Sequence, residues 1–443
     1  MPARLFRTVA RLAAAAALLG LTGIRSGTLA ERAPKLAIAP LVSPAGAHSS
    51  EPQMTMEGDR VILSWLEVNG ERTTLKFSER TSAGWSRAKS VFSSGNFFVN
   101  AFDVPSVRLL ADGTLAAHWL EQNGDNEDAS QVRVSFSKDQ GGTWSKPVSP
   151  HHDGTQTEHG FASLFQAPGA GLGMVWIDGR ATDPEKETGD MSLRASIYDG
   201  RGKQLREMVV APRVCECCST AAAETPDGVI VAFRNRRANE IRDIYVTRLA
   251  AGRWSAPNIV HADGWRIEAC PINGPAIGAR GQDVAVAWFT AKEDKGQSYV
   301  AFSHDAGRTF GTPVRVDDGT SAGRLGVQLL DDGSAAVMWI ESTNQRTRLQ
   351  VRIVTPGGTP AGARSVPVTV AETEGSRYPR LAGITTNCYF RGPTPIKVLR
   401  KCARRAQKSR HSRMRTGVLM NAHHSSRLRH SAAARPRTNT ISA

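Results

Sequence analysis

The sequence lacks the short motifs that mark several large classes of enzyme. Its 443 residues contain no P-loop, no Rossmann glycine fingerprint, no zincin motif and no Ser-His-Asp signature. These absences exclude the usual nucleotide chemistry and the familiar protease mechanisms. The function must therefore be inferred from repeats and from the residues that the repeats bring together.

Long apolar runs are also missing, apart from one near the N-terminus. The run Leu12–Ile24 follows three arginines and precedes Thr28-Leu29-Ala30. It is too short to span a bilayer comfortably, and the order of its parts is typical of an export signal over residues 1–30. No Cys follows closely, which argues against a lipoprotein. We expect a periplasmic or secreted protein with no stable membrane insertion after signal removal.

Acidic residues are absent from the C-terminal end. Residues 391–443 hold fourteen Lys or Arg, and removing those charges from the formal net charge of +15 leaves +1. The basic character belongs to a tail, residues 384–443, and we expect no nucleic-acid partner. This tail could be an arm that binds an anionic surface, or it could be a disordered extension. We favour a third interpretation, a slip of the reading frame beyond about Ile384, because the repeat described next stops in mid-unit.

The chain contains instead a regular repeat of short strands. An apolar strand ending in an aromatic residue recurs six times, at spacings of 54, 57, 57, 55 and 51 residues. Such a period, with Gly and Asp turns between the strands, is typical of β-propeller blades. The aromatics are predicted to wedge between blades and to have no chemical role. They are Trp65, Trp119, Trp176, Phe233, Trp288 and Trp339.

Two hairpin turns share a longer motif. Residues 137–144 have the pattern S-x-D-x-G-x-T-W, and residues 303–310 repeat it with Phe last. The motif offers a carboxylate and a hydroxyl that can hydrogen-bond to backbone N–H groups, followed by a Gly free to adopt positive φ. It predicts a tight hairpin corner whose polar groups hydrogen-bond to one another, above a buried aromatic residue. The motif residues are Ser137, Asp139, Gly141, Thr143 and Trp144, and then Ser303, Asp305, Gly307, Thr309 and Phe310.

These turns and their array resemble the Asp boxes, or bacterial neuraminidase repeats, of the sialidase superfamily. The resemblance covers roughly residues 35–380. It implies an all-β, sialidase-like β-propeller of six to seven four-stranded blades over residues 31–383. Residues 35–43 are expected to supply the detached last strand, and the closing blade is predicted to be incomplete. The resemblance also implies a glycan or glycoconjugate as partner.

Residues at the start of each first strand should form a ring, because the innermost strands of a propeller surround one channel. The side chains there are chemically capable, so we expect the functional site at this mouth. They are Asn100, Asp103, Glu158, His159, Cys215, Cys217, Cys218, Cys270, Arg324, Tyr378 and Arg380.

The cysteines of this ring have two interpretations. Cys215, Cys217 and Cys218 occupy the same place in one unit that Cys270 occupies in the next. We favour disulfides that join adjacent blades, as expected in an oxidising compartment. Since Cys217 and Cys218 cannot easily bond to each other, at least one should bridge to Cys270. The alternative is a thiolate site for Cu or Zn completed by His159 or His261; otherwise no cofactor is required.

The resemblance to sialidases also implies catalytic roles. These enzymes hold the sugar carboxylate with three arginines, attack with a Tyr activated by a Glu, and use an Asp as acid/base. Tyr378, Glu158 and Asp103 are the implied nucleophile, base and acid/base. The implied arginine clamp is Arg180, Arg234 and Arg324.

The activity implied is that of an exo-α-sialidase acting on terminal acidic sugars, although the Arg-Ile-Pro motif of sialidases is absent. Two other functions therefore stay open. One is a non-catalytic propeller that binds a glycan or protein, and the other is a thiol or metal-site protein that uses the cysteines.

Overall fold

A computed structural model describes the chain over residues 36–169, 171–186, 188–319, 321–343, 346–358, 364–366, 379–384, 387–391 and 396–401. The chain divides into two compact units, Met1–Pro34 and Lys35–Ala443, and all described residues belong to the second. The predicted export signal, Tyr378 and residues 402–443 lie outside the described residues.

Six antiparallel sheets follow one another along residues 49–366, each made of consecutive strands. The first contains β2 (Ser49–Glu57), β3 (Arg60–Asn69), β4 (Arg72–Thr81), β5 (Gly84–Trp85) and β6 (Lys89–Ser94). The second contains β7 (Ser106–Leu109), β8 (Leu115–Gln122) and β9 (Ser130–Ser137), and a bridge from Val134 to Val148 stands in for its fourth strand. The third contains β10 (His159–Gln166), β11 (Leu172–Asp178), β14 (Ser192–Tyr198) and β15 (Gln204–Ala211), with a small hairpin of β12 (Thr182–Asp183) and β13 (Thr188–Gly189) beside it.

The next three sheets repeat the arrangement. The fourth contains β16 (Ala221–Thr225), β17 (Gly228–Arg234), β18 (Ile244–Ala250), β19 (Arg253–Trp254) and β20 (Asn258–Ile259). The fifth contains β21 (Ala276–Arg280), β22 (Asp283–Thr290), β23 (Gln297–Ser303) and β24 (Val314–Arg315). The sixth contains β25 (Ser321–Leu329), β26 (Ala335–Thr343), β27 (Arg346–Val354) and β28 (Arg364–Val366). The one helix in the described part of the chain is the 3₁₀ helix η1 (Lys292–Asp294), so no described helix could cross a membrane.

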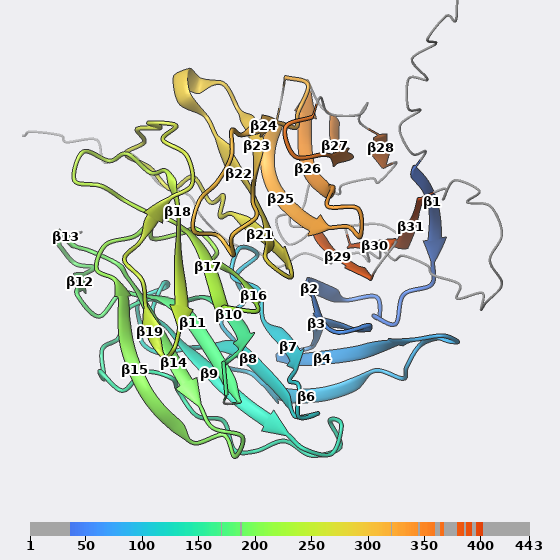
Figure 1. Cartoon of the computed structure of the whole chain (residues 1–443). Coiled ribbons are helices and arrows are strands. Elements are labelled where there is room, and N and C mark those ends of the chain that lie inside the picture. The colour runs from blue at the N-terminus through green and yellow to red at the C-terminus, as the bar shows by residue number, and fades with distance from the viewer. Residues whose placement is uncertain are drawn as a thin grey trace, which may run out of the picture. The chain divides into compact units, whose positions relative to one another are not determined.

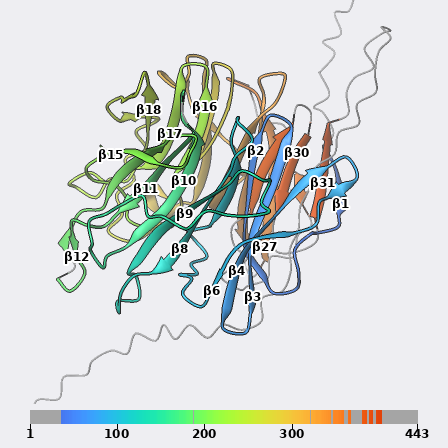
Figure 2. The same ribbon diagram turned by 90° about the horizontal axis from the view of Figure 1, so that it is seen from below.

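A closing sheet joins the two ends of the ring. It contains β29 (Arg380–Ile384), β30 (Asn387–Arg391), β31 (Ile396–Lys401) and, as its outermost strand, β1 (Leu36–Leu41). Strand β29 contacts both β25 and β2, so this sheet lies between the sixth and the first. Figure 2 shows β1 beside β31, and the predicted detached strand is confirmed.

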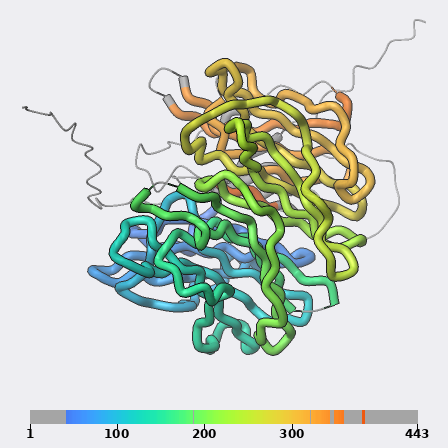
Figure 3. Tube along the Cα trace, turned by 90° about the vertical axis from the view of Figure 1, so that its left-hand side faces the viewer, coloured from blue at the N-terminus to red at the C-terminus, as the bar shows by residue number. Residues whose placement is uncertain are grey.

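The innermost strands β2, β7, β10, β16, β21, β25 and β29 surround the centre of this ring in Figure 1. In Figure 3, segments that are close in sequence, and therefore similar in colour, lie side by side, as expected of blades that follow one another along the chain. The predicted all-β propeller of six to seven blades is therefore confirmed. One detail differs, because the closing sheet has four described strands where we expected an incomplete blade. Two of these strands, β30 and β31, lie in the predicted tail, so the boundary at residue 384 was placed too early.

The hydrophobic core is divided among the interfaces between blades. Five of the six described buried clusters combine residues of two adjacent sheets, because both faces of a blade are covered by its neighbours. The remaining cluster joins the first and sixth sheets with Ala382 of the closing sheet. Trp144 packs edge-on against Phe77 of the preceding sheet, with ring centroids 6.1 Å apart. The six repeating aromatics lie on the second strands of the blades and are all at most 1% exposed, which confirms their predicted structural role.

The two predicted corners are closed by the same hydrogen bonds. Asp139 Oδ1 accepts the Thr143 N–H at 2.9 Å and the Ser137 hydroxyl at 2.8 Å, and its Oδ2 accepts the Thr143 hydroxyl at 2.8 Å. Asp305 accepts the equivalent bonds from the Thr309 N–H at 2.9 Å, the Ser303 hydroxyl at 2.7 Å and the Thr309 hydroxyl at 2.6 Å. Each corner therefore satisfies its own polar groups, as the sequence predicts.

Candidate functional site

The innermost strands begin with a distinctive backbone feature at one mouth of the channel. Register shifts occur near the start of β2, β10 and β25. Within each shift one non-glycine residue is left-handed, namely Glu51 (φ 48°), Phe161 (φ 52°) and Arg324 (φ 58°). Such a conformation costs on the order of 1–3 kcal/mol per residue and is concentrated at functional sites, where a bulge re-aims a side chain.

Acidic and basic side chains from four blades meet at this mouth. Asp103, just before β7, is 3% exposed and accepts a hydrogen bond from the backbone N–H of Phe161. Burial raises the pKa of Asp103 to about 7, although the Phe161 bond and the Arg380 charge oppose the change. Burial and the Asp103 charge raise the pKa of Glu51 well above its usual value. Burial also lowers the pKa of Arg380 to about 10.

Glu158 is a third carboxyl group of the same cluster. Burial raises its pKa to about 8, and the charges of Asp128, Asp103 and Glu216 add to this effect. No hydrogen bond or ion pair of its side chain occurs among the described residues. Glu158 and Asp103, both predicted from the sequence, therefore lie close enough to influence each other, and Glu158 is mostly protonated at neutral pH.

A cavity of about 410 Å³ extends down the channel from this mouth, lined by the innermost strands. Three arginines line it: Arg108, Arg324 and Arg380. Arg108 is paired with Glu224 at 2.7 Å. The Arg324 guanidinium lies 5.3 Å from the centre of the Phe102 ring, a cation–π distance that joins the sixth blade to the segment before the second.

Two of the three predicted clamp arginines lie elsewhere. The Arg234 side chain is buried and donates to the backbone carbonyls of Asn273, Arg242 and Phe289. Arg180 is paired with Asp178, Glu207 and Asp153. Neither lines the cavity, so Arg324 alone of the predicted clamp does. The third predicted catalytic residue, Tyr378, lies outside the described residues.

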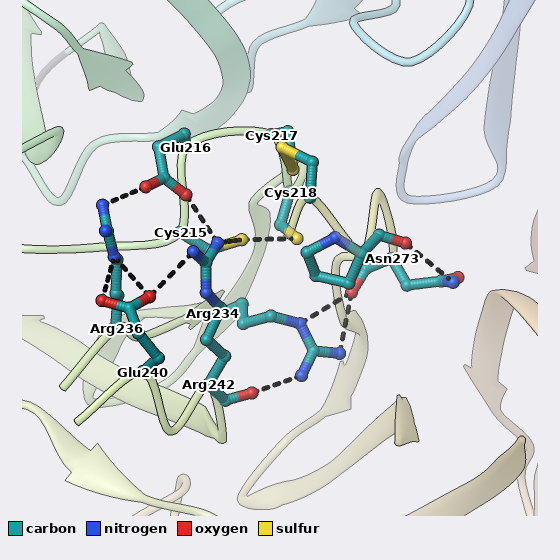
Figure 4. The surroundings of a disulfide bond; sticks show 11 residues. Cys215, Glu216, Cys217, Cys218, Arg234, Arg236, Glu240, Arg242 and Asn273 are labelled. Carbon is teal, nitrogen blue, oxygen red and sulfur yellow. Dashed lines mark hydrogen bonds and ion pairs between the residues drawn. A yellow bond between two sulfur atoms is a disulfide. The ribbon is translucent and has the colours of Figure 1, made fainter. Parts of the chain in front are cut away.

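The cysteines gather at the starts of the fourth and fifth blades (Figure 4). Cys217 and Cys270 form a disulfide between the two blades, so the favoured prediction is confirmed for this pair. In the chain-entropy model, closing a loop of 53 residues stabilises the fold by about 4 kcal/mol. Cys215 and Cys218 are free and buried, with their sulfur atoms 2.9 Å apart.

Two groups of side chains have metal-ligating atoms close together in the described residues. One is Cys215, Cys217 and Cys218, but the disulfide of Cys217 leaves two thiols rather than the four ligands of a closed zinc site. The other is His151, Asp153 and His159.

His159 therefore belongs to a histidine and aspartate cluster, and its described contacts include none of the cysteines. Its ring stacks on His151 with centroids 3.9 Å apart, and its Nε2 lies 3.3 Å from Asp153 Oδ2. Arg180 Nη2 also lies 3.3 Å from this oxygen, and its positive charge would repel a cation. The predicted metal role of His159 at the cysteines thus has no support from the geometry.

Comparisons with known proteins show no family for this chain. No model of a known protein family matches the chain, and no curated protein matches it in sequence. Among solved structures, the NanB sialidase of Streptococcus pneumoniae (K499G mutant) has a TM-score of 0.43 at 10% identity, covering 75% of this chain and 80% of that one. AofleA of Arthrobotrys oligospora has a TM-score of 0.41 at 12% identity, covering 76% of this chain and 87% of that one. The polysaccharide lyase Uly1 has a TM-score of 0.48 at 11% identity, covering 84% of this chain and 93% of that one. At these values the likenesses carry no argument about activity.

Sequence reasoning missed two residues of the site, Glu51 and Arg108. The repeat contained the signal for Glu51, which lies 14 residues before the buried Trp65, much as Arg324 lies 15 before Trp339. Arg108 lies on an innermost strand, but nothing in its sequence neighbourhood indicates which face of the strand it occupies.

Proposed function

We propose that this chain is an exported glycoside hydrolase of exo-α-sialidase type, which cleaves terminal acidic sugars from glycans at the channel mouth. The observation that carries this proposal is that Asp103 lies close enough to both Arg380 and Glu158 for their charges to act on one another at the channel mouth. Of these three residues, Arg380 lines the cavity. The Cys217–Cys270 disulfide supports an oxidising compartment, either the periplasm or the medium.

Cleavage of a glycosidic bond needs a group that gives a proton to the leaving oxygen. A carboxyl group suits this role when its pKa lies near the working pH, as it does for Asp103 at about 7. We assign Asp103 as the acid/base and Glu158 as the base that takes the proton of Tyr378. Tyr378 directly precedes Pro379 and Arg380, which both line the cavity.

The substrate must also be held by its carboxylate. Arg324 suits this task because it lines the cavity and its guanidinium offers paired donors in one plane. Phe102, under the same guanidinium, supplies an apolar surface at the mouth. The left-handed backbone of Arg324, within the bulge of β25, sets the direction in which its side chain leaves the strand.

The proposal is tested with fluorogenic glycosides, including a sialoside and a uronide. The wild-type protein should turn over an acidic glycoside, and both Asp103→Asn and Tyr378→Phe should lower kcat by about 10²- to 10⁴-fold. Glu79→Gln is the matched control, because Glu79 lies on β4 and pairs with Arg60 at 2.5 Å. The control should keep its activity. Binding of a glycan without turnover by the wild-type protein would identify a non-catalytic binding propeller and overturn the hydrolase.

A further inference from the structure

The four cysteines of the mouth form one sulfur cluster rather than two separate pairs. The Sγ atoms of Cys215, Cys217 and Cys218 all lie within 4.8 Å of one another, and Cys217 is bonded to Cys270. Figure 4 shows the two free thiols below the disulfide, on the same short segment of chain. A free thiol therefore lies within a small movement of a disulfide sulfur.

The two pairs differ in their access to solvent. Cys215 and Cys218 are 0% and 1% exposed, whereas Cys217 is half-buried and Cys270 is exposed. A thiol or disulfide in solution can therefore reach the Cys217–Cys270 pair first. The buried pair can react with an outside molecule only through the exposed one.

The two buried thiols also differ in their surroundings. Arg242 Nη1 lies 3.5 Å from Cys215 Sγ, and Arg242 is held by Glu216 at 2.6 Å and Glu240 at 3.0 Å. Burial raises the pKa of the Cys215 thiol, but the bond from Cys218 and the charges of the two nearby arginines outweigh it and lower the pKa to about 7. Burial and the neighbouring thiol raise the pKa of Cys218 well above its usual value. Cys215 is thus the nucleophile of the pair, since the thiolate is the attacking species.

We propose that Cys215, Cys217, Cys218 and Cys270 form a thiol–disulfide exchange site, in which electrons pass from the buried dithiol to the exposed disulfide and from there to a disulfide in solution. This activity does not depend on the proposed glycoside hydrolase. Its substrates are small or protein disulfides and thiols that can reach Cys270.

The exchange balances within the protein. The Cys215 thiolate attacks Cys217 Sγ, the Cys217–Cys270 bond breaks, and Cys270 leaves as a thiolate that takes a proton from water. Cys218 then loses its proton and attacks Cys215 Sγ, so that Cys217 leaves as a thiolate and takes up that proton. One disulfide is broken and one is formed. Cys215 and Cys218 are oxidised by two electrons together, and Cys217 and Cys270 are reduced by two.

The second half of the reaction involves the outside disulfide. Cys270 loses its proton and attacks the outside disulfide as a thiolate, and the outside thiolate that leaves takes up a proton. Cys217 then loses its proton and attacks Cys270 Sγ of the mixed disulfide, so that the second outside thiolate leaves and is protonated in turn. The protein then holds both disulfides, and an outside dithiol restores the starting state. Oxidised glutathione is the probe for the disulfide, and reduced glutathione is the probe for the thiol.

The experiment equilibrates the full-length native protein in glutathione buffers of graded ratio, quenches with acid, alkylates the free thiols and maps each cysteine by peptide mass spectrometry. We expect a Cys215–Cys218 disulfide to accumulate in the wild-type protein. In a Cys215→Ser variant the attacking thiolate is missing, so reduction of the Cys217–Cys270 bond through the buried pair should fall at least tenfold and Cys270 should stay bonded to Cys217. Arg242→Lys should move the pH midpoint of exchange upward, which a purely structural role of the cysteines would not do. Cys402→Ser is the matched control and should exchange as the wild-type protein does.

Two results would overturn the proposal. One is a Cys217–Cys270 disulfide that persists at every ratio, with Cys215 and Cys218 alkylated only after denaturation. The other is a preparation with four thiols and stoichiometric zinc or copper, which would make the cluster a metal site. If Cys215→Ser fails to fold, Cys218→Ser replaces it: it should stop at the Cys215–Cys217 intermediate, and absence of that intermediate would also contradict the exchange.

Discussion

A carboxyl group that is half-buried and has no described hydrogen bond or ion pair lowers stability when it ionises, and Glu158 is such a group. Its pKa is about 8 in the folded protein and 4.5 in an ordinary environment. Between these values the unfolded chain loses the proton while the folded protein keeps it. The free energy of unfolding therefore falls as the pH rises through this window and levels off above about pH 8.

Replacing Glu158 by Gln should remove that loss of stability. We expect Glu158→Gln to gain on the order of 1 kcal/mol relative to wild type between about pH 5 and pH 8, after allowance for partial solvent screening. Urea unfolding at the two pH values measures this difference. Glu79→Gln, at an exposed ion pair, should show no such gain. Parallel pH dependence in wild type and Glu158→Gln would show that Glu158 does not titrate as described.

Single residues were also the hardest to predict from the sequence. Asp103 and Glu158 could be found because each precedes a first strand of the repeat. Arg234 could not be assigned correctly, because its role depends on three backbone carbonyls that come from other parts of the fold. The bond from Cys217, rather than Cys218, to Cys270 likewise depends on which sulfur points toward the next blade.

At the scale of elements, the two corner turns fix the spacing between neighbouring blades. Gly307 has φ +77°, and a Cβ added there would lie 2.0 Å from Ile230 Cδ1 of the preceding blade. Gly333 has nearly the same backbone, φ +76°, with nothing within 4 Å of its Cβ position. Substitutions at Gly307 and Gly333 therefore share the same backbone strain, and only the one at Gly307 adds overpacking.

We predict that Gly307→Ala destabilises the protein more than Gly333→Ala does. The control should cost about 1 kcal/mol from backbone strain alone, and Gly307→Ala should cost about 1–3 kcal/mol more from overpacking. Urea unfolding of the two variants, with an activity assay to confirm folding, checks the difference. Equal losses would mean that this corner does not pack tightly against the preceding blade.

The elements themselves could be predicted because their signal is local. An apolar strand that ends in an aromatic recurs in every unit, and each copy forms the second strand of a blade with its aromatic buried. The bulges at the starts of β2, β10 and β25 could not be predicted in this way. They place Glu51, Phe161 and Arg324 at the mouth through a left-handed backbone that these residue types do not favour.

At the scale of the whole molecule, the ring depends on pairing between the two ends of the chain. Strand β1 pairs with β31 from Leu36 opposite Lys401 to Leu41 opposite Ile396. The sequence predicted the N-terminal strand of this pair but assigned its partner to the tail. The alternation of apolar and polar residues is weak beyond Ile384, so the sequence does not reveal the strands there. Strands can still pair in the closing sheet, because pairing requires only backbone hydrogen bonds.

Truncation tests this closure. A chain that ends at Thr386 lacks β30 and β31, and we expect it to unfold at a lower temperature and to self-associate, because β1 and β29 lose their neighbours. A chain that ends at Lys401 keeps all the described strands and should behave as the full-length protein. Thermal unfolding and sedimentation measure the two effects. Equal behaviour of both truncated chains would show that the closing sheet contributes nothing to stability.

The pH dependence of kcat/KM is the decisive test of the proposed cleavage of an acidic glycoside by the carboxyl groups at the channel mouth. Glu158 must be ionised and Asp103 protonated, with pKa values of about 8 and 7. The profile should therefore be bell-shaped with its maximum between about pH 7 and pH 8. Asp103→Asn should abolish the bell together with most of the activity. A wild-type protein with no turnover at any pH, or an unchanged profile in Asp103→Asn, would contradict the account.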